Sequence, residues 1–391
     1  MTHLLKPVRD FLVSLRLTVY LLGFGIVLIF WATLGQVDLG VWGVQHKFFH
    51  SFFVIEKIPG TGLFIPVFPG GYLIGGLLLV NLIAAQIYRF TFTWRKAGIW
   101  LTHAGLITLL LGELLSGILQ EDYSMAIDEG GTRNYSVSER FCELAVVDAS
   151  DAKTDRVFAF PEQLLQKTGS IQIPGLPFLV VPRAYYPNST LALRKDAPNA
   201  PPSLATAGDG REIVATPLPL SYKEDDQNFP SAFVELIAPQ GSMGTFLVST
   251  QYQTPQVIEY PIGHPWKLTL RFTRKYHPFS ITLLKFTHDV YPGTDIPKNF
   301  ASKIQLKSAD GTENREFLIY MNNPLRYGGF TFYQQKFANE DKTTILQVVK
   351  NPGWLMPYVA CALMTVGLSF HFLIHLAGFV ARRRASKPLT A

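Results

Sequence analysis

The chain has 391 residues, of which 48% are hydrophobic and 16% are charged, and its formal net charge is +6 at pH 7. This charge does not indicate a nucleic-acid-binding protein, because much of the basic excess flanks long apolar runs near the two ends of the sequence. The two cysteines, Cys142 and Cys361, lie in a polar segment and in an apolar run, which argues against a disulfide framework and a thiolate metal site. We therefore expect a protein of the lipid bilayer, with no nucleic-acid partner.

Residues 17–34 form the first apolar run, and basic residues precede it. A cleaved signal peptide is the alternative interpretation. The run is long, has no small-x-small cleavage site and is followed by further apolar runs, so we expect a retained transmembrane helix. The preceding basic residues predict a cytoplasmic N-terminus.

Residues 35–70 are rich in aromatic side chains, and we expect an extracytoplasmic loop that lies in the membrane interface. His46 and His50 are four residues apart and would share one face of a helix. That spacing is compatible with a metal or haem iron, although two interfacial polar residues are the simpler interpretation.

Residues 71–88 are the predicted second span. Gly71 and Gly75 form a small-x-x-x-small pattern that permits close helix approach, and Asn81 and Gln86 are expected to form helix–helix hydrogen bonds. The connector 89–97 is short and basic, which predicts a cytoplasmic position.

Residues 98–119 are the predicted third span, and they include His103 and Glu113. Ionisable groups inside a bilayer are costly and mark function. His103 lies about five residues from the cytoplasmic end, roughly 7–8 Å deep at 1.5 Å per residue. Glu113 is expected near the outer boundary, where its carboxylate reaches the interface. A small-residue packing face is expected from Gly105, Gly112 and Ser116.

Residues 120–352 are expected to form one large extracytoplasmic β-rich domain, a sandwich or barrel of short strands. Strands are predicted at 143–147, 177–184, 232–237, 267–273, 280–287, 303–306, 330–334 and 343–349. Residues 188–230 are expected to be a long loop or a weakly ordered insertion. A faint echo between 178–187 and 281–292 indicates two related β halves.

The predicted β domain carries no recognisable catalytic motif. His264, His277 and His288 are interpreted as structural or surface residues. Cys142 is interpreted as a strand residue, with a redox role as the alternative.

A fourth apolar run, at about 354–379, returns the chain to the cytoplasm, and a basic cluster follows it. His371 and His375 lie one helical turn apart in this run. With His103, they are expected in the inner leaflet, where an imidazole can relay protons, bond a neighbouring helix or ligate haem iron. His103 is the strongest candidate ligand, and His371 is a candidate neighbour of a haem pocket. The basic cluster consists of Arg382, Arg383, Arg384 and Lys387.

The predicted fold is therefore a four-helix transmembrane bundle with a β-rich domain inserted between helices 3 and 4. The expected parts are residues 1–119 with the first three helices, residues 120–352 with the β domain, and residues 353–391 with the fourth helix and a basic tail. Both termini are expected in the cytoplasm.

The strings Val290–Ile304 (VYPGTDIPKNFASKI) and Tyr320–Gln334 (YMNNPLRYGGFTFYQ), followed by Asn351-Pro-Gly, resemble the ResB (CcsB) family of cytochrome c biogenesis proteins. The predicted arrangement of helices and domain is similar, and so is His103-x-Gly105 in the third span. The resemblance covers essentially the whole chain. The second string is its most specific part.

The resemblance implies a subunit of the System II cytochrome c synthase, located in a bacterial inner membrane or a thylakoid membrane. Its partner would be a ResC (CcsA) protein with a tryptophan-rich haem-handling segment. The complex would move haem b outward and join its vinyl groups to the thiols of a Cys-x-x-Cys-His motif in apocytochrome c. His103 matches the family's axial haem ligand within the membrane. The other ligand is expected from the partner.

The six tryptophans of this chain are scattered, so the resemblance implies the B subunit alone, with a compact extracytoplasmic domain and no attachment activity unaided. A different hypothesis is a membrane-anchored scaffold whose β domain binds apocytochrome or the partner without binding haem. A sensor or transporter subunit is disfavoured, because the spans carry too few charges for an ion path.

Overall fold

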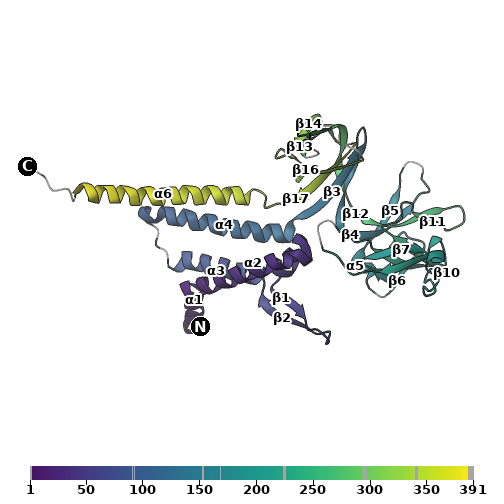
Figure 1. Cartoon of the computed structure of the whole chain (residues 1–391), viewed down its shortest axis with the longest axis horizontal. Coiled ribbons are helices and arrows are strands. Elements are labelled where there is room, and N and C mark those ends of the chain that lie inside the picture. The colour runs from purple at the N-terminus through teal and green to yellow at the C-terminus, as the bar shows by residue number, and fades with distance from the viewer. Residues whose placement is uncertain are drawn as a thin grey trace, which may run out of the picture. The chain divides into compact units, whose positions relative to one another are not determined.

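The computed structural model describes residues 2–385, except 90, 92, 152–153, 168, 223–225, 294–296 and 340–341. Lys387 and the middle of the string Val290–Ile304 lie outside the described residues. The chain divides into two compact units (Figure 1). The first comprises residues 1–121, 222–224 and 350–391, and the second comprises residues 122–221 and 225–349.

The first unit contains the helices. Its elements are α1 (Thr2–Leu12), α2 (Leu15–Val44), the π-helix η1 (Gln45–Phe49), the hairpin β1 (Phe53–Lys57) and β2 (Phe64–Pro69), α3 (Gly71–Tyr88), the 3₁₀ turn η2 (Trp94–Lys96), α4 (Ala97–Leu119) and α6 (Met356–Ala385). Four segments are long and apolar enough to cross a membrane, namely Leu15–Phe49, Gly71–Tyr88, Trp94–Leu119 and Met356–Arg383. The prediction of four membrane helices is confirmed at this level, while α1 was not predicted.

The expected loop 35–70 is regular structure instead. Helix α2 continues to Val44 and kinks at Gly40, whose φ of 64° is readily accessible only to glycine. The chain then folds back on α2, because Phe48 and Val54 are buried in one cluster with α2 side chains. The Phe48 ring lies 5.4 Å from that of Trp31, edge to face. Burying these aromatic and apolar groups stabilises the π-helix and the hairpin where an interfacial loop was predicted.

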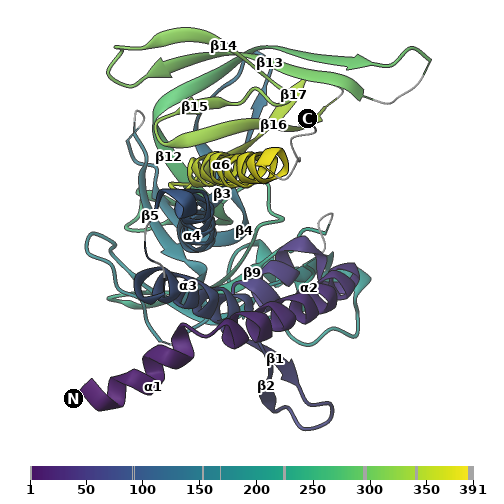
Figure 2. The same cartoon turned by 90° about the vertical axis from the view of Figure 1, so that its left-hand side faces the viewer.

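Helices α4 and α6 approach closely along a line of small residues on both helices. A Cβ atom on Gly98 would lie 2.6 Å from the carbonyl oxygen of Gly367, and one on Gly105 would lie 2.8 Å from that of Ala360. Gly98, Gly105 and Gly112 recur every seven residues, so they share one face of α4. The two helices lie directly beside each other in Figures 1 and 2. The predicted small-residue packing face is therefore the contact with α6.

Helix α3 meets the α1–α2 junction through Asn81. Its side-chain nitrogen donates to the carbonyl oxygen of Leu12 at 2.6 Å, and its oxygen accepts from Thr18 at 2.7 Å. These bonds satisfy a carbonyl left free where the helices change direction. The prediction of a helix–helix bond is confirmed for Asn81 and wrong for Gln86. The amide of Gln86 is buried, and neither polar atom has a hydrogen-bond partner within the described chain.

The second unit is built from strands. They are β3 (Glu121–Asp128), β4 (Thr132–Asp148), β5 (Arg156–Pro161), β6 (Leu179–Tyr186), β7 (Ser189–Leu193), β8 (Ile213–Pro217), β9 (Ser231–Ala238), β10 (Gly241–Ser249), β11 (Gln256–Glu259), β12 (Pro265–Val290), β13 (Pro297–Ser308), β14 (Asn314–Tyr320), β15 (Leu325–Tyr327), β16 (Phe330–Ala338) and β17 (Thr343–Lys350), with the short helix α5 (Glu162–Leu165). Every predicted strand coincides with or overlaps one of these. Segment 188–230 is more ordered than expected, because β7 and β8 pair antiparallel within it.

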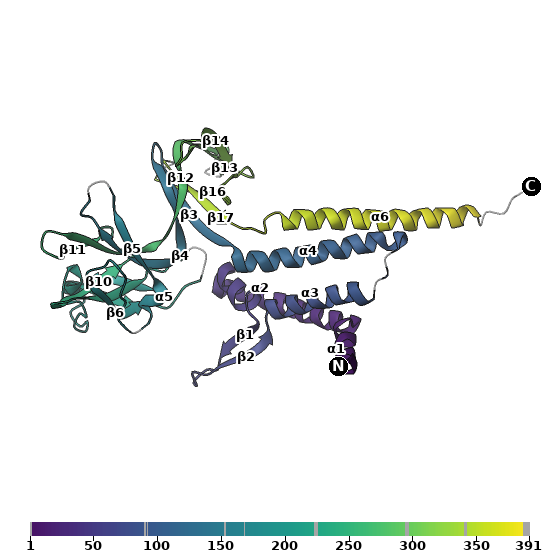
Figure 3. The same ribbon diagram turned by 180° about the vertical axis from the view of Figure 1, so that it is seen from behind.

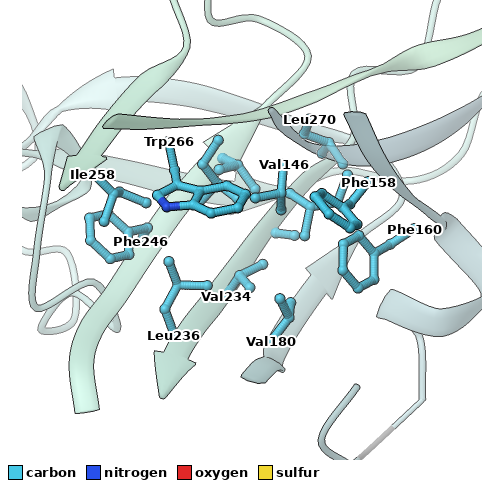
Figure 4. Packing of buried hydrophobic residues seen from close by; sticks show 14 of the residues in the cluster. Val146, Phe158, Phe160, Val180, Val234, Leu236, Phe246, Ile258, Trp266 and Leu270 are labelled. Carbon is cyan, nitrogen blue, oxygen red and sulfur yellow. The ribbon is translucent and has the colours of Figure 1, made fainter. Parts of the chain in front are cut away.

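Two long strands link two hydrophobic cores. The main sheet has the order β14-β13-β12-β4-β3-β17-β16-β15, with β11 beside β12 and β5 beside β4, and β10-β9-β6 form a second sheet. The β4–β12 register shifts between Phe272 and Arg274 and again between Tyr276 and Ile281. The first core gathers around Trp266 and Phe158 (Figure 4), and the second contains Ile281 and its neighbours. The echoing segments 178–187 and 281–292 thus contribute to different cores, and their relatedness stays a prediction.

The α4–α6 contact predicts that Gly367→Ala destabilises the first unit. Its Cβ would lie 2.7 Å from the backbone nitrogen of Thr102, and relieving such overpacking typically costs about 1–3 kcal/mol. A thermal-unfolding measurement on the full-length protein in detergent should give a lower Tm. Gly23→Ala in α2 is the control, because a Cβ there meets no atom within 4 Å. An equal Tm for both variants would contradict the close helix approach.

Candidate functional site

His103 lies on α4 and is half-buried. Its Nδ1 is 2.8 Å from the carbonyl oxygen of Ile99. A carbonyl can only accept, so a neutral imidazole in this position carries its proton on Nδ1 and its lone pair on Nε2. Metal-binding histidines use the same arrangement, in which a backbone bond orients the ring and the other nitrogen coordinates.

The α4–α6 contact determines which way His103 faces. At 3.6 residues per turn, His103 lies about 140° around α4 from Gly98, well away from the face that packs on α6. Leu110 and Leu114 follow it by seven and eleven residues and share its face. Both line a cavity with residues of α3. His103 therefore belongs to the α3-facing side of α4.

Gln86 lies on the facing side of α3. A Cβ on Gly117 would be 3.0 Å from the hydroxyl oxygen of Tyr72, which sets the register of α3 against α4 at one end. The two helices are antiparallel (Figure 3). Gln86 follows Tyr72 by fourteen residues on α3, and His103 precedes Gly117 by fourteen residues on α4. Each step spans about 21 Å along its helix, in the same direction because the helices are antiparallel. By this register, we expect the Gln86 amide and the His103 imidazole at similar heights along the α3–α4 interface.

His371 is placed differently. It is half-buried on α6, and a Cβ on Gly98 would lie 2.7 Å from its backbone nitrogen. Its ring is 4.4 Å from that of His375, which is exposed. His371 thus lies at the α4–α6 contact, whereas His103 turns away from it. His103 and His371 therefore lie at different faces of α4, His103 toward α3 and His371 against the α6-facing side. A haem-pocket role for His371 stays a prediction.

A third polar group lies where α3 begins and α4 ends. His50 stacks on Tyr72 with ring centroids 5.5 Å apart, and its ring is 5.7 Å from that of His46. His50 and Glu113 both line two neighbouring cavities of about 230 and 170 Å³. The sequence singled out His50 and Glu113 separately, but it carries no signal that brings them together.

The second unit holds its ionisable groups in structural roles. His264 pairs with Asp148 at 2.9 Å, and His288 stacks on Phe300 with centroids 4.9 Å apart. His277 is buried with its Nε2 3.0 Å from the hydroxyl of Ser136. Within the described residues, no group of three or more His, Cys, Asp or Glu side chains is placed to hold a metal ion. These positions agree with the structural interpretation of the three histidines.

Cys142 is enclosed in the first core. Its sulfur lies 3.4 Å from a carboxylate oxygen of Glu162 and 3.3 Å from the hydroxyl of Tyr185. Burial raises the pKa of this thiol to about 12. Because the thiolate is the reactive form, Cys142 is inert at neutral pH, which supports its interpretation as a strand residue.

Comparison with known proteins finds similarity in one segment of the chain. Residues 264–345 match the model of the ResB-like family. This segment of the chain is similar to the ResB-like family. Protein NrfI of Wolinella succinogenes is 35% identical over 96 residues, which are 25% of this chain and 11% of NrfI. Cytochrome c biogenesis protein CcsB of Picosynechococcus is 30% identical over 98 residues, 25% of this chain and 20% of CcsB. The aligned segment thus spans only a small part of either relative.

The ResB-like region runs from the start of β12 into β17 and supplies most of the second core. Within it, Leu325 and Phe332 are buried on a hairpin. Gly328 and Gly329 form its two-residue turn, with φ of 59° and 81°. Positive φ at both positions is the requirement of the type I′ turn that suits twisted strands. The family string therefore encodes a turn and core contacts, and the matched region includes none of the four membrane helices.

His277 predicts that acid destabilises the second unit. Burial and the nearby charge of Lys275 lower the pKa of this imidazole from 6.5 to about 4. The imidazole therefore binds a proton more readily in the unfolded chain than in the folded one. As a result, the free energy of unfolding rises with pH between about 4 and 6.5, by about 3 kcal/mol in total, and this contribution is constant at higher pH. Thermal unfolding of the full-length protein at several pH values should show this slope. His277→Phe should remove it, and His264→Gln should keep it.

Cys142 predicts a slow thiol reaction. At pH 7.5, iodoacetamide should modify Cys142 in the folded protein at least a hundred times more slowly than after denaturation in urea, because the thiol is buried and protonated. Mass spectrometry of the peptide that contains Cys142 gives both rates. Equal rates in the two states would contradict the buried placement.

Proposed function

We propose that this ResB-like protein is a subunit of the System II cytochrome c synthase. It helps to carry haem b across the membrane and presents it with apocytochrome c for covalent attachment. Three findings support the proposal: the family, the similarity to a protein named for cytochrome c biogenesis, and the apolar helices. The single observation that carries the haem role is the orientation of His103, whose Nδ1 lies 2.8 Å from the carbonyl oxygen of Ile99, the backbone contact typical of histidines that ligate metals.

In the proposed complex, haem is a substrate in transit. His103 supplies one axial ligand, and a ResC (CcsA) partner with a tryptophan-rich segment supplies the other. Basic residues at the helix ends favour cytoplasmic termini and an extracytoplasmic β unit. His103 then lies in the inner leaflet, where haem enters. Gln86, on the facing stripe of α3, is a second polar group for the same substrate.

The attachment reaction adds a cysteine S–H across a haem vinyl group. The sulfur bonds to one vinyl carbon, and the thiol proton ends on the other, so no atom is lost. The step requires close alignment of vinyl and thiol. The sequence of the β unit carries no recognisable catalytic motif, so we assign alignment to this protein and attachment to the whole complex.

A scaffold without haem is the second candidate function. Strand β14 forms one edge of the main sheet and exposes Leu318 and Tyr320. An exposed edge can accept an extended peptide as an additional strand. In this hypothesis apocytochrome c or the partner binds at β14, and the helices only anchor the unit.

The haem role predicts the behaviour of His103→Gly. When the protein is purified with its partner, this variant should lose the six-coordinate spectrum of bound haem, and cytochrome c maturation should fall at least tenfold. Added imidazole should restore the spectrum by occupying the vacated position. His375→Ala, on an exposed face of α6, is the control and should retain both properties. Unchanged haem binding and maturation in His103→Gly would reject the ligand role and favour the scaffold.

A further inference from the structure

The cavity of about 170 Å³ at the start of α3 and the end of α4 is separate from His103. Glu113, in its wall, is ten residues from His103, or about 15 Å along the helix. Its apolar walls come from Leu79, Leu110 and Leu114. Gly75 and Gly76 line it as well, and a Cβ on either would meet no atom within 4 Å. The absence of side chains at these two glycines therefore creates space.

The volume of the cavity is compatible with a ligand that contains one small ring. A cavity of about 150 Å³ lined by apolar side chains holds one benzene molecule. A space of about 170 Å³ therefore accommodates one substituted six-membered ring. The surrounding helices are apolar enough to lie in a bilayer, so a ligand that dissolves in the membrane can reach it.

The polar residues at the edge of the cavity indicate which substituents the ring would carry. His50, Tyr72 and Glu113 line the cavity, and together they offer hydrogen-bond donors and acceptors. The nearly parallel stack of His50 on Tyr72, at an interplanar angle of 8°, orients the imidazole. None of the described residues that line the cavity is a lysine or arginine, which disfavours a phosphate or carboxylate ligand. A neutral ring with carbonyl or hydroxyl groups fits this rim.

We propose that this cavity binds the ring of a lipid-soluble quinone or hydroquinone. The ring lies against Leu110 and Leu114, its oxygens bond His50 and Glu113, and its isoprenoid tail leaves along α3 past Gly75 and Gly76. The adjoining cavity of about 230 Å³ also contacts His50 and Glu113 and is lined by Gln36 and Gln45, so it offers polar contacts on the far side of the rim. The proposal concerns binding and is independent of the haem role of His103.

The test uses the full-length protein in lipid nanodiscs with ubiquinone-1 and menadione as probes. At least one probe should bind saturably by isothermal titration calorimetry and raise the Tm by several degrees at saturation. Gly76→Leu fills the cavity and should weaken binding at least tenfold. Glu113→Gln and His50→Leu should weaken it about fivefold or more, because each removes a hydrogen-bonding group.

Two variants serve as controls. Gly23→Leu, at an open position of α2, and His103→Gly should both bind the probes as the unmodified chain does. Failure of both probes to bind saturably would overturn the proposal, and so would equal binding by Gly76→Leu. Binding that is insensitive to His50 and Glu113 but abolished by excess phospholipid would assign the cavity to an acyl chain, which also overturns it.

Discussion

The contact between α4 and α6 is the constraint on which the membrane unit depends. Lipid tails are as apolar as the side chains, so helices gain little from excluding water and associate through close van der Waals contact. Gly98 and Gly105 allow that contact because a Cβ on either would touch the backbone of α6. Because this face of α4 packs against α6, the helical periodicity of α4 places His103 and Leu110 on the side that faces α3. The position of the candidate ligand therefore follows from glycines on a different face of α4.

The α3–α4 interface has two polar ends and an apolar middle. The helical register puts His103 and Gln86 toward one end, and His50 and Glu113 line a cavity at the other, whose walls include Leu79, Leu110 and Leu114. A buried amide without a partner is costly in a bilayer, and so is an ionisable side chain. Because these polar groups concentrate on this interface, while α4 and α6 meet through small residues, we assign the proposed functions to the α3–α4 interface.

The second unit holds its buried cysteine and its buried histidine in unreactive forms. Its two cores share β4 and β12, its thiol Cys142 is buried and protonated, and its buried histidine His277 is neutral at physiological pH. The ResB-like region lies in the strands of the second core, where its most specific string forms a glycine turn. Under the proposed function, such a unit supplies shape and strand edges for binding, and the chemistry takes place in the membrane or on partner molecules.

The sequence by itself determined four apolar spans, seven of the strands (β12 from two predicted segments) and His103 as a candidate, because hydropathy length, alternation and an ionisable group in an apolar run are local properties. It missed the continuation of α2 beyond residue 34, since that segment is stabilised by burying Phe48 against distant side chains. Only the tertiary structure decided that Gln86 lacks a hydrogen-bond partner within the described chain and that Glu113 and His50 line the same cavities. Both depend on how helices far apart in the chain rotate against one another, and that rotation is set by contacts which no local pattern records.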